Sequence, residues 1–384
     1  MLMKLYKRLI QINTDGRHSI FLFGPRGTGK TLWIKTHLEE TLYFDLLNTE
    51  IYNDFIANPS RLEKRIPKKF KHFIVIDEVQ KIPALLNEVH RLIESYGYRF
   101  ILTGSSARSL RRKGVNLLGG RALNYTMHPL IYNELEADFS LETALTFGLL
   151  PSVYHITDPK HYLETYVTNY LREEVLQEGL TRNLSEFARF LETASFSQGN
   201  VVNMSEISRE LGIDRKLVAS YFDILEDLLI SYRLPVFSKR AKRRLVAHPK
   251  FYFFDPGVYR VIRPRGPLDL TEEIDGAVLE TVFLVHLRAL NDYCRLGYHL
   301  YYWRTSNGAE VDFIVYGEKG LFAFEIKRKR TLHKADFTGL RAFLQDYPIA
   351  RCYLLYGGEH EEYHDHIQVL PFVKGLAQLL SILS

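Results

Sequence analysis

A glycine-rich octapeptide near the amino end constrains the fold of this chain more than any other feature. An apolar run, Ser19–Phe23, precedes it, and a helical pattern, Lys30–Glu40, follows it. The octapeptide reads Gly24-Pro25-Arg26-Gly27-Thr28-Gly29-Lys30-Thr31. Glycines let the backbone curl so that successive N–H groups face a phosphate at a helix N-terminus. Two glycines, Lys and Thr between a strand and a helix therefore predict a phosphate loop.

Such a loop assigns a role to each of its polar side chains. We expect Lys30 to reach the β and γ phosphates of ATP, and the Thr31 hydroxyl to ligate Mg²⁺. The alternative is a glycine-rich turn without a ligand. Because the strand, the loop and the helix all agree, the segment Gly24–Thr31 is interpreted as the ATP site.

Two acidic residues follow a second apolar run, Phe73–Ile76. Four consecutive apolar residues are typical of a buried central strand, and ligands of open α/β sheets bind at the carboxyl ends of their strands. We expect Asp77 to hold Mg²⁺, directly or through water, and Glu78 to polarise the attacking water. A surface acidic pair is the alternative.

A third apolar strand ends in hydroxyl groups, and an arginine lies beyond it. In an additional-strand ATPase such a strand, here Ile101–Ser106, lies between the two motif strands. Thr103 or Ser105 would then face the γ-phosphate, although a simple strand-end turn explains them as well. Arg121 follows a Gly-Gly turn. Supplied by a neighbouring subunit, it would stabilise transition-state charge; a solvated arginine is the alternative.

The pattern along the 384 residues divides the chain into three parts. Strand–helix alternation over residues 1–150 predicts a parallel sheet covered by helices. Residues 151–262 are mostly helical, and residues 263–384 return to mixed strands and helices after a Pro/Gly-rich linker around Gly266.

Composition excludes several classes of protein. Two cysteines rule out a disulfide framework or a cysteine-rich zinc site and suit the cytoplasm. No apolar run approaches the length of a membrane helix, and the amino end lacks the apolar core of a secretory signal. The net charge of +5 is mild, so nucleic acid is indicated only where basic residues cluster.

The middle part carries a helix–turn–helix rhythm. A short helix ends at Gly212, a longer one covers Arg215–Leu229, and a basic cluster, Ser238–Arg244, follows. The second helix of such a unit enters the major groove, and a basic wing contacts phosphates. The acidic second half of this helix weakens the DNA interpretation, since Arg215, Lys216 and Ser220 are its only obvious donors. A packing module between subunits is the alternative.

The last part contains a predicted β-hairpin with three charged residues. Asp312 lies on the first strand, and Glu325 and Lys327 lie two residues apart on the second, so the latter two share a face. Facing carboxylates hold Mg²⁺, and a nearby lysine orients water or stabilises developing charge. This is the Asp…Glu-x-Lys constellation of the restriction-endonuclease fold, with Glu280 as an additional acid. The acidic and histidine-rich segment Glu359–His366 is interpreted as a solvated loop.

Four segments together resemble the ATPase domain of a prokaryotic AAA-type family with a C-terminal restriction-endonuclease-like, PD-(D/E)xK, domain. They are Gly24–Thr31, Phe73–Lys81, Ile101–Ala107 and Leu117–Leu135. The resemblance runs along nearly the whole chain and implies that Arg121 is the arginine finger and that the chain forms rings. It departs at Gly148–Ser152, where the family has Gly-Gly-aromatic-Pro followed by an acid.

Two functions follow from these features. The first is an ATP- and Mg²⁺-dependent DNA-processing protein in which Asp312, Glu325 and Lys327 hydrolyse phosphodiesters and Asp312 and Glu325 bind the metal. The second is a nucleotide switch whose nuclease-like domain binds DNA or a protein partner without cutting. In both, we expect a P-loop ATPase and a winged helix. We also expect a homo-oligomer, with a hexameric ring as one form, and DNA as a partner, with branched or single-stranded DNA among the forms bound. Binding to a membrane is not expected.

Overall fold

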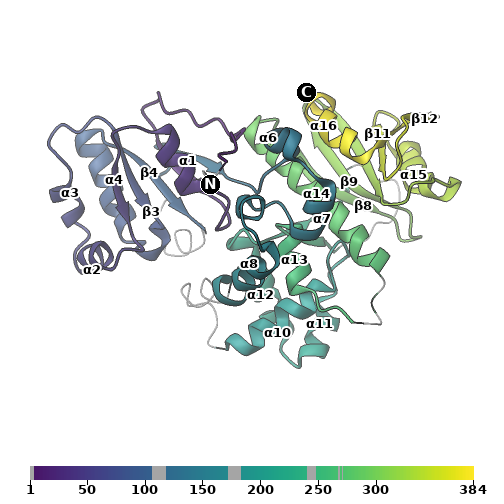
Figure 1. Ribbon diagram of the computed structural model, residues 1–384, viewed down its shortest axis with the longest axis horizontal. Coiled ribbons are helices and arrows are strands. Elements are labelled where there is room, and N and C mark those ends of the chain that lie inside the picture. The colour runs from purple at the N-terminus through teal and green to yellow at the C-terminus, as the bar shows by residue number, and fades with distance from the viewer. Residues whose placement is uncertain (1–3, 106–117, 172–182, 240–247, 267–268, 270) are drawn as a thin grey trace.

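The computed structural model describes residues 4–105, 118–171, 183–239, 248–266, 269 and 271–384. Three parts are arranged around the long helix α14. In Figure 1 one sheet lies on the left, a group of helices lies below α14, and a second sheet lies on the right. Most of the predicted basic cluster, residues 240–244, lies outside the described residues, as do residues 172–182 of the part expected to be mostly helical. No described helix combines the length and the apolar character of a membrane span.

The first sheet is parallel, as predicted, and its five strands run in the order β2-β3-β4-β1-β5. The strand β4 lies between β1 and β3, which confirms the additional-strand arrangement. The strands are β1 (Ser19–Phe23), β2 (Leu42–Asp45), β3 (Phe73–Asp77), β4 (Arg99–Gly104) and β5 (Ala122–Thr126). The helices around this sheet are α1 (Lys30–His37), α2 (Thr49–Ala57), α3 (Arg61–Arg65) and α4 (Leu85–Tyr96).

The middle part is helical with a two-stranded antiparallel sheet. The left-handed Gly212, with φ of 68°, ends α11, and Asp214 caps α12, so the predicted break between these two helices is present. Two short helices, α6 (Tyr132–Leu135) and α7 (Leu141–Phe147), lead into this part. Its own helices are α8 (Pro159–Thr165), the π-helix Tyr166–Leu171, α10 (Leu184–Ser195), α11 (Met204–Leu211), α12 (Arg215–Asp227) and α13 (Pro256–Ile262). The strands are β6 (Ser231–Leu234) and β7 (Lys250–Phe253).

The last part is a mixed sheet of six strands in the order β12-β13-β11-β10-β9-β8. The predicted hairpin is present as the antiparallel pair β9–β10, while β10, β11 and β13 are parallel. The strands are β8 (His299–Arg304), β9 (Glu310–Gly317), β10 (Gly320–Lys327), β11 (Arg351–Tyr356), β12 (Glu362–His364) and β13 (Ile367–Pro371). The helices are α14 (Thr271–Tyr293), α15 (Thr338–Asp346) and α16 (Phe372–Leu383).

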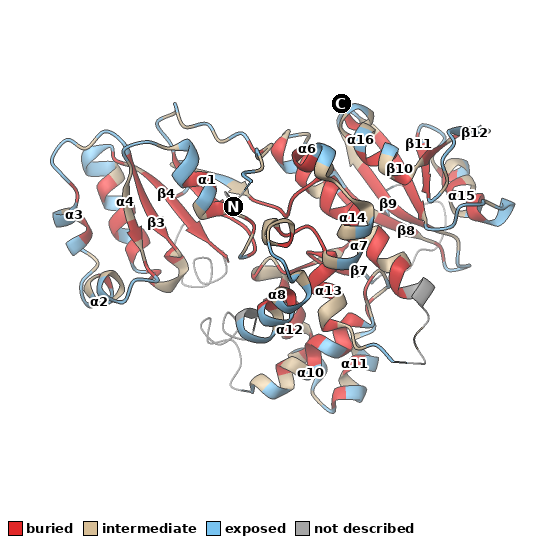
Figure 2. Ribbon diagram, viewed as in Figure 1, coloured by how far each residue is buried: buried red, intermediate tan, exposed pale blue. Residues whose placement is uncertain are grey.

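The segment after β6 joins the middle part to this second sheet. The backbone N–H of Phe237 donates to the carbonyl of Tyr302 at 2.7 Å, and the N–H of Tyr302 donates to the carbonyl of Pro235 at 3.0 Å. The buried Phe237 ring belongs to the same core as Trp303 and packs against the Phe343 ring of α15. Figure 2 shows the strands of both large sheets and much of α14 as buried. The β6–β7 hairpin is therefore docked on the edge strand β8.

A tight backbone joint holds α7 against α13 beside the segment Gly148–Ser152. The buried Asp255 carboxylate accepts hydrogen bonds from the N–H groups of Leu149 at 2.7 Å and Val258 at 3.0 Å. Burial raises the pKa of Asp255 to about 6. A Cβ on Gly257 would lie 2.1 Å from the carbonyl oxygen of Phe147. Backbone thus packs on backbone here, which leaves no room for a side chain.

Substitution Gly257→Ala is expected to destabilise the protein, because the added methyl group cannot fit against α7. Overpacking of this kind costs about 1–3 kcal/mol. The matched control is Gly276→Ala, at a helical glycine in α14 with open space around its Cβ position. This control should gain up to about 1 kcal/mol, because alanine favours helix. Calorimetry measures the midpoint temperature of unfolding of both variants. Equal midpoints would contradict the close backbone packing at Gly257.

Candidate functional site

The phosphate loop connects β1 to α1 and has the backbone that its glycines permit. Gly27 and Gly29 adopt φ of 80° and 95°, and a Cβ on Gly24 would lie 2.4 Å from the carbonyl oxygen of Met127. These conformations and this close approach favour glycine. The buried Lys30 ammonium donates to the carbonyls of Gly24 at 2.7 Å and Pro25 at 3.1 Å. Lys30 thus points back into the loop that would surround the phosphates.

Asp77 lies at the carboxyl end of β3 and meets hydroxyl groups from three neighbouring elements. Its carboxylate accepts a hydrogen bond from Thr31 at 3.0 Å, and further bonds from Tyr43 on β2 and Thr103 on β4. Burial, followed by the hydrogen bond to Asp77, raises the pKa of Tyr43 above its ordinary value. The structure therefore brings the two predicted Mg²⁺ ligands of this site, Thr31 and Asp77, within hydrogen-bond distance.

Glu78 is held in a left-handed backbone conformation, with φ of 61°. Its N–H donates to the Thr103 hydroxyl at 3.3 Å, and its carboxylate accepts from the amide of Gln80. The same amide donates to the Ser105 hydroxyl at 3.0 Å. Of the two candidate hydroxyls, Thr103 therefore contacts the acidic pair directly, and Ser105, just after β4, is linked to Glu78 through Gln80. Gln80, which the sequence did not single out, positions Glu78.

The residues of this site fit ATP with Mg²⁺. Carboxylate and hydroxyl oxygens are the ligands that Mg²⁺ prefers, and Thr31 and Asp77 supply one of each. The glycine-rich loop precedes α1, so its N–H groups lie where a helix N-terminus favours phosphate. Bound ATP would supply the phosphoanhydride, and Lys30 would compensate the charge on its phosphates.

Arg121 precedes β5 and therefore lies at the amino edge of the parallel sheet. Its carbonyl accepts from the N–H of Ser19 at 2.9 Å, and its guanidinium pairs with Glu94 on α4. The phosphate loop leaves the opposite, carboxyl edge of the same sheet. Within the described chain Arg121 is thus not brought to its own phosphate loop, and its action on a neighbouring subunit stays a prediction.

Arg8 contacts the phosphate loop although no motif contains it. Its buried guanidinium donates to the carbonyls of Thr28 at 2.6 Å and His128 at 2.7 Å, to Glu134 Oε1 at 2.9 Å and to the Tyr293 hydroxyl at 2.9 Å. Tyr293 lies at the end of α14, so Arg8 links the loop to the C-terminal part. The alternating basic and apolar residues around Arg8 carried no signal for this role.

The helical part also contacts the loop. The Tyr166 hydroxyl donates to the carbonyl of Arg26 at 3.1 Å. A Cβ on Gly27 would lie 3.3 Å from the Tyr162 hydroxyl. The tip of the phosphate loop therefore packs against α8 and the π-helix that follows it.

The three predicted residues of the C-terminal hairpin lie together. Asp312 Oδ2 accepts from the N–H of Ile326 at 2.9 Å, and Lys327 Nζ donates to Glu325 Oε1 at 2.5 Å. The other oxygen of Glu325, Oε2, is buried and has no hydrogen-bond partner among the described residues. Burial, followed by the charge of Asp312, raises the pKa of Glu325 to about 8.

A lysine from the middle part of the chain lies among the carboxylates beside this hairpin. Lys250 on β7 is 2% exposed, and its Nζ lies 3.4 Å from Asp312 Oδ1 and 3.8 Å from Glu280 Oε2. It also contacts Glu310. Burial, followed by the charge of Asp312, raises the pKa of Glu280 to about 7. Sequence reasoning missed Lys250 and Glu310, because a lone charged residue in a strand gives no signal of what it faces.

This cluster does not fit a Mg²⁺ ion as it is arranged. Among the described residues, no group of three or more His, Cys, Asp or Glu side chains is suited to hold a metal. Asp312, Glu280 and Glu310 instead surround the Lys250 ammonium. The metal and catalytic roles of Asp312, Glu325 and Lys327 remain sequence predictions.

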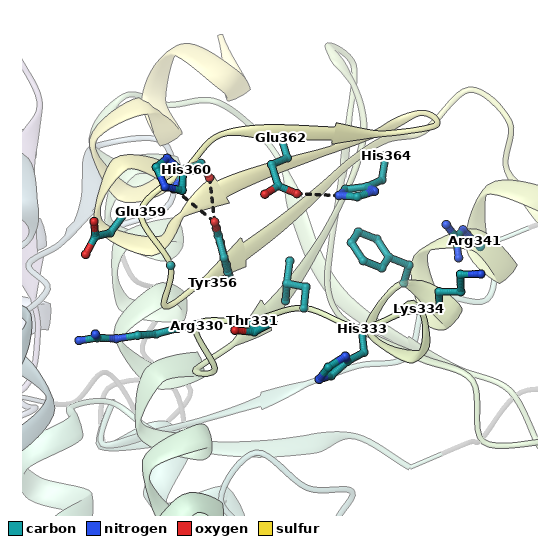
Figure 3. A pocket seen from close by; sticks show the side chains of 13 residues that line it. Arg330, Thr331, His333, Lys334, Arg341, Tyr356, Glu359, His360, Glu362 and His364 are labelled. Carbon is teal, nitrogen blue, oxygen red and sulfur yellow. Dashed lines mark hydrogen bonds and ion pairs between the residues drawn. The ribbon is translucent and has the colours of Figure 1, made fainter.

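A surface pocket of about 530 Å³ lies beyond the carboxyl ends of β10 and β11. Figure 3 shows His364 hydrogen-bonded to Glu362, at 2.8 Å, on one side of it. The expected loop over 359–366 thus contains the short edge strand β12. None of the predicted catalytic residues is among the described side chains that line the pocket, which include Arg330, His333, Lys334, Arg341, Tyr356, Glu359 and His360.

The charges of α12 separate along the helix. Arg215 and Lys216 are exposed in its first turn. Asp223 and Glu226, in its second half, pair with Arg233 on β6. Arg233 therefore offsets part of the negative charge of the acidic half, and the exposed beginning of the helix is basic.

Three family models match successive parts of the chain. Residues 16–136 match an AAA domain. Residues 138–269 match a domain of unknown function, DUF8612, and residues 275–374 match another, DUF4143.

The similar curated proteins are themselves uncharacterized. Proteins of Mycobacterium tuberculosis and Mycobacterium bovis are each 28% identical over 299 residues, which is 75% of this chain and 65% of the relative. The chain thus matches slightly less than two thirds of their length. A protein of Methanocaldococcus jannaschii is 23% identical over 351 residues, covering 82% of this chain and 76% of its own.

Two solved structures show a distant likeness. The ORC1 protein of Aeropyrum pernix in complex with DNA is 14% identical, with a TM-score of 0.26 over 70% of this chain and 88% of its own. The DNA clamp loader delta protein of Bacillus subtilis is 16% identical, with a TM-score of 0.23 over 54% and 83%. Scores this low do not establish a common overall fold. The family match, the parallel sheet and the phosphate loop identify residues 16–136 as a P-loop ATPase domain of the AAA type.

Proposed function

We propose that this protein binds and hydrolyses ATP with Mg²⁺ and uses its nucleotide state to control its hold on DNA. The observation that carries the enzymatic part is the hydrogen bond between Thr31 and Asp77, at 3.0 Å, beside the phosphate loop. It joins the two oxygen ligands of the proposed metal across adjacent motifs. Lys30 then neutralises the phosphates, and Glu78, held by Gln80, polarises the attacking water.

Contacts around the phosphate loop support the switch. Arg8 joins the Thr28 carbonyl to Tyr293 of α14, and Tyr166 of the helical part donates to the Arg26 carbonyl. Bound phosphate draws the loop's N–H groups and Lys30 toward itself. Because the carbonyls of the same loop accept from Arg8 and Tyr166, a change in the loop alters contacts with both other parts.

The helical part supports DNA as the partner. The helices α11 and α12, followed by the β6–β7 hairpin, have the element order of a winged helix, and Arg215 and Lys216 are exposed where α12 begins. A recognition helix contacts DNA with its N-terminal residues. Cleavage is outside this proposal, because Asp312 faces Lys250.

Substitution Lys30→Ala is expected to lower the ATP turnover number by about 100-fold or more, since a preorganised positive charge on the phosphates is lost. Steady-state phosphate release with Mg²⁺ measures it. Lys64→Ala, at an exposed lysine of α3, serves as the control and should keep full turnover. Full ATP turnover by the Lys30→Ala variant would contradict the assignment of Gly24–Thr31 as the ATP site.

Arg121→Ala is expected to lose about a thousand-fold in turnover if its guanidinium acts on a neighbouring subunit. Mixing inactive Arg121→Ala with inactive Lys30→Ala should then restore activity. Such an assembly contains interfaces where an intact phosphate loop meets an intact arginine. A mixture no more active than the sum of its components would contradict the finger and the ring.

The double substitution Arg215→Ala/Lys216→Ala is expected to weaken DNA binding and to reduce the slope of log affinity against log salt by about 2. Fluorescence anisotropy with duplex and single-stranded DNA at several salt concentrations measures both quantities. Lys160→Ala/Lys319→Ala removes the same charge from other exposed positions and should leave the slope unchanged. Equal slopes in all three proteins would exclude α12 as the contact.

A further inference from the structure

The carboxylate cluster of the C-terminal sheet surrounds a cation that belongs to the chain itself. Glu310 and Asp312 come from β9, and Glu280 comes from α14. The ammonium of Lys250 contacts Glu310 and lies 3.4 Å from Asp312 and 3.8 Å from Glu280. Three carboxylates thus converge on one side chain that is almost fully buried. A buried charge persists only where it is paired in this way.

Neighbouring contacts fix Lys250 in this position. Tyr252, two residues along β7 and on the same face, donates from its hydroxyl to Glu280 Oε2 at 2.6 Å. Two residues before the same strand begins, the carbonyl of His248 accepts from the Tyr302 hydroxyl on β8. The Phe237–Tyr302 backbone bond holds the other arm of the hairpin on β8. Contacts two residues before Lys250 and two residues after it therefore hold this lysine against the C-terminal part.

A divalent metal ion and this ammonium cannot share the cluster. Mg²⁺ takes six oxygen ligands at about 2.1 Å in near-octahedral geometry. Asp312 has committed Oδ2 to the N–H of Ile326, and its other oxygen, Oδ1, faces Lys250. A metal on Oδ1 would therefore lie against a positive charge that is almost fully buried.

We propose that Lys250 is the resident cation of the cluster formed by Glu280, Glu310 and Asp312, and that it excludes divalent metal ions while the β6–β7 hairpin is docked. On this proposal, the C-terminal part contains the predicted cleavage residues Asp312, Glu325 and Lys327. The helical part supplies Lys250, which prevents a metal ion from binding beside them. The proposal concerns the nucleotide-free protein and does not depend on ATP turnover or on DNA binding, so its failure would leave the proposed function untouched.

Calorimetric titration of the full, nucleotide-free chain with Mn²⁺ tests this assignment. Lys250→Met keeps the length of the stem and removes the charge, so this variant is expected to bind one more Mn²⁺ than the unsubstituted chain. Adding Asp312→Asn should abolish the extra ion. Lys239→Met, an exposed lysine of the same hairpin, is the matched control and should gain no ion.

Two results would overturn the proposal. One is Mn²⁺ binding by the unsubstituted chain that Asp312→Asn alone removes, since the cluster would then accept metal beside Lys250. The other is a Lys250→Met protein with a native circular dichroism spectrum and no additional ion. If Lys250→Met does not fold, the comparison of the unsubstituted chain with Asp312→Asn decides by itself, because equal Mn²⁺ binding by these two supports exclusion.

Discussion

One buried guanidinium joins the amino-terminal segment, the phosphate loop and the long helix α14. Arg8 is surrounded by Thr28, His128, Glu134 and Tyr293, and each of these accepts one of its hydrogen bonds. Moving such a charge out of water carries a desolvation penalty of roughly several kcal/mol, which is offset only where the hydrogen-bond donors of the ion are satisfied. The amino-terminal segment, the ATPase sheet and α14 are therefore held in one relative position. The shape of the loop is tied to that position.

The same constraint recurs at a second position along α14. Lys250 is buried among carboxylates from α14 and β9, as Arg8 is buried beside Glu134 and Tyr293. Both cations lie outside the recognisable motifs, and both bridge parts of the chain that are remote in sequence. The residues that carry chemistry are thus surrounded by residues that fix how the parts dock. The proposed switch requires such bridges, because a change at the nucleotide site must alter contacts in distant parts of the chain.

Much of the ATPase part was predictable because its signals are local. The run Phe73–Ile76 and the glycines of Gly24–Thr31 specify a strand and a loop from their own chemistry, and the structure agrees. The strand β2 was missed because Leu42–Asp45 is short and only partly apolar, and its Tyr43 was missed with it. The strand β5 was missed because it lies at the sheet edge and is nowhere fully buried.

Sequence by itself determined the phosphate loop, the acidic pair, the hairpin with Asp312, Glu325 and Lys327, and the break between α11 and α12. Each of these depends on residues close together in the chain, where spacing sets geometry. Only the tertiary structure decided that Lys250 faces Asp312, that Arg8 reaches Thr28, and that Arg233 pairs with two acids of α12. The reason is that burial of a charge is settled by which distant elements pack around it, and no local pattern records that packing.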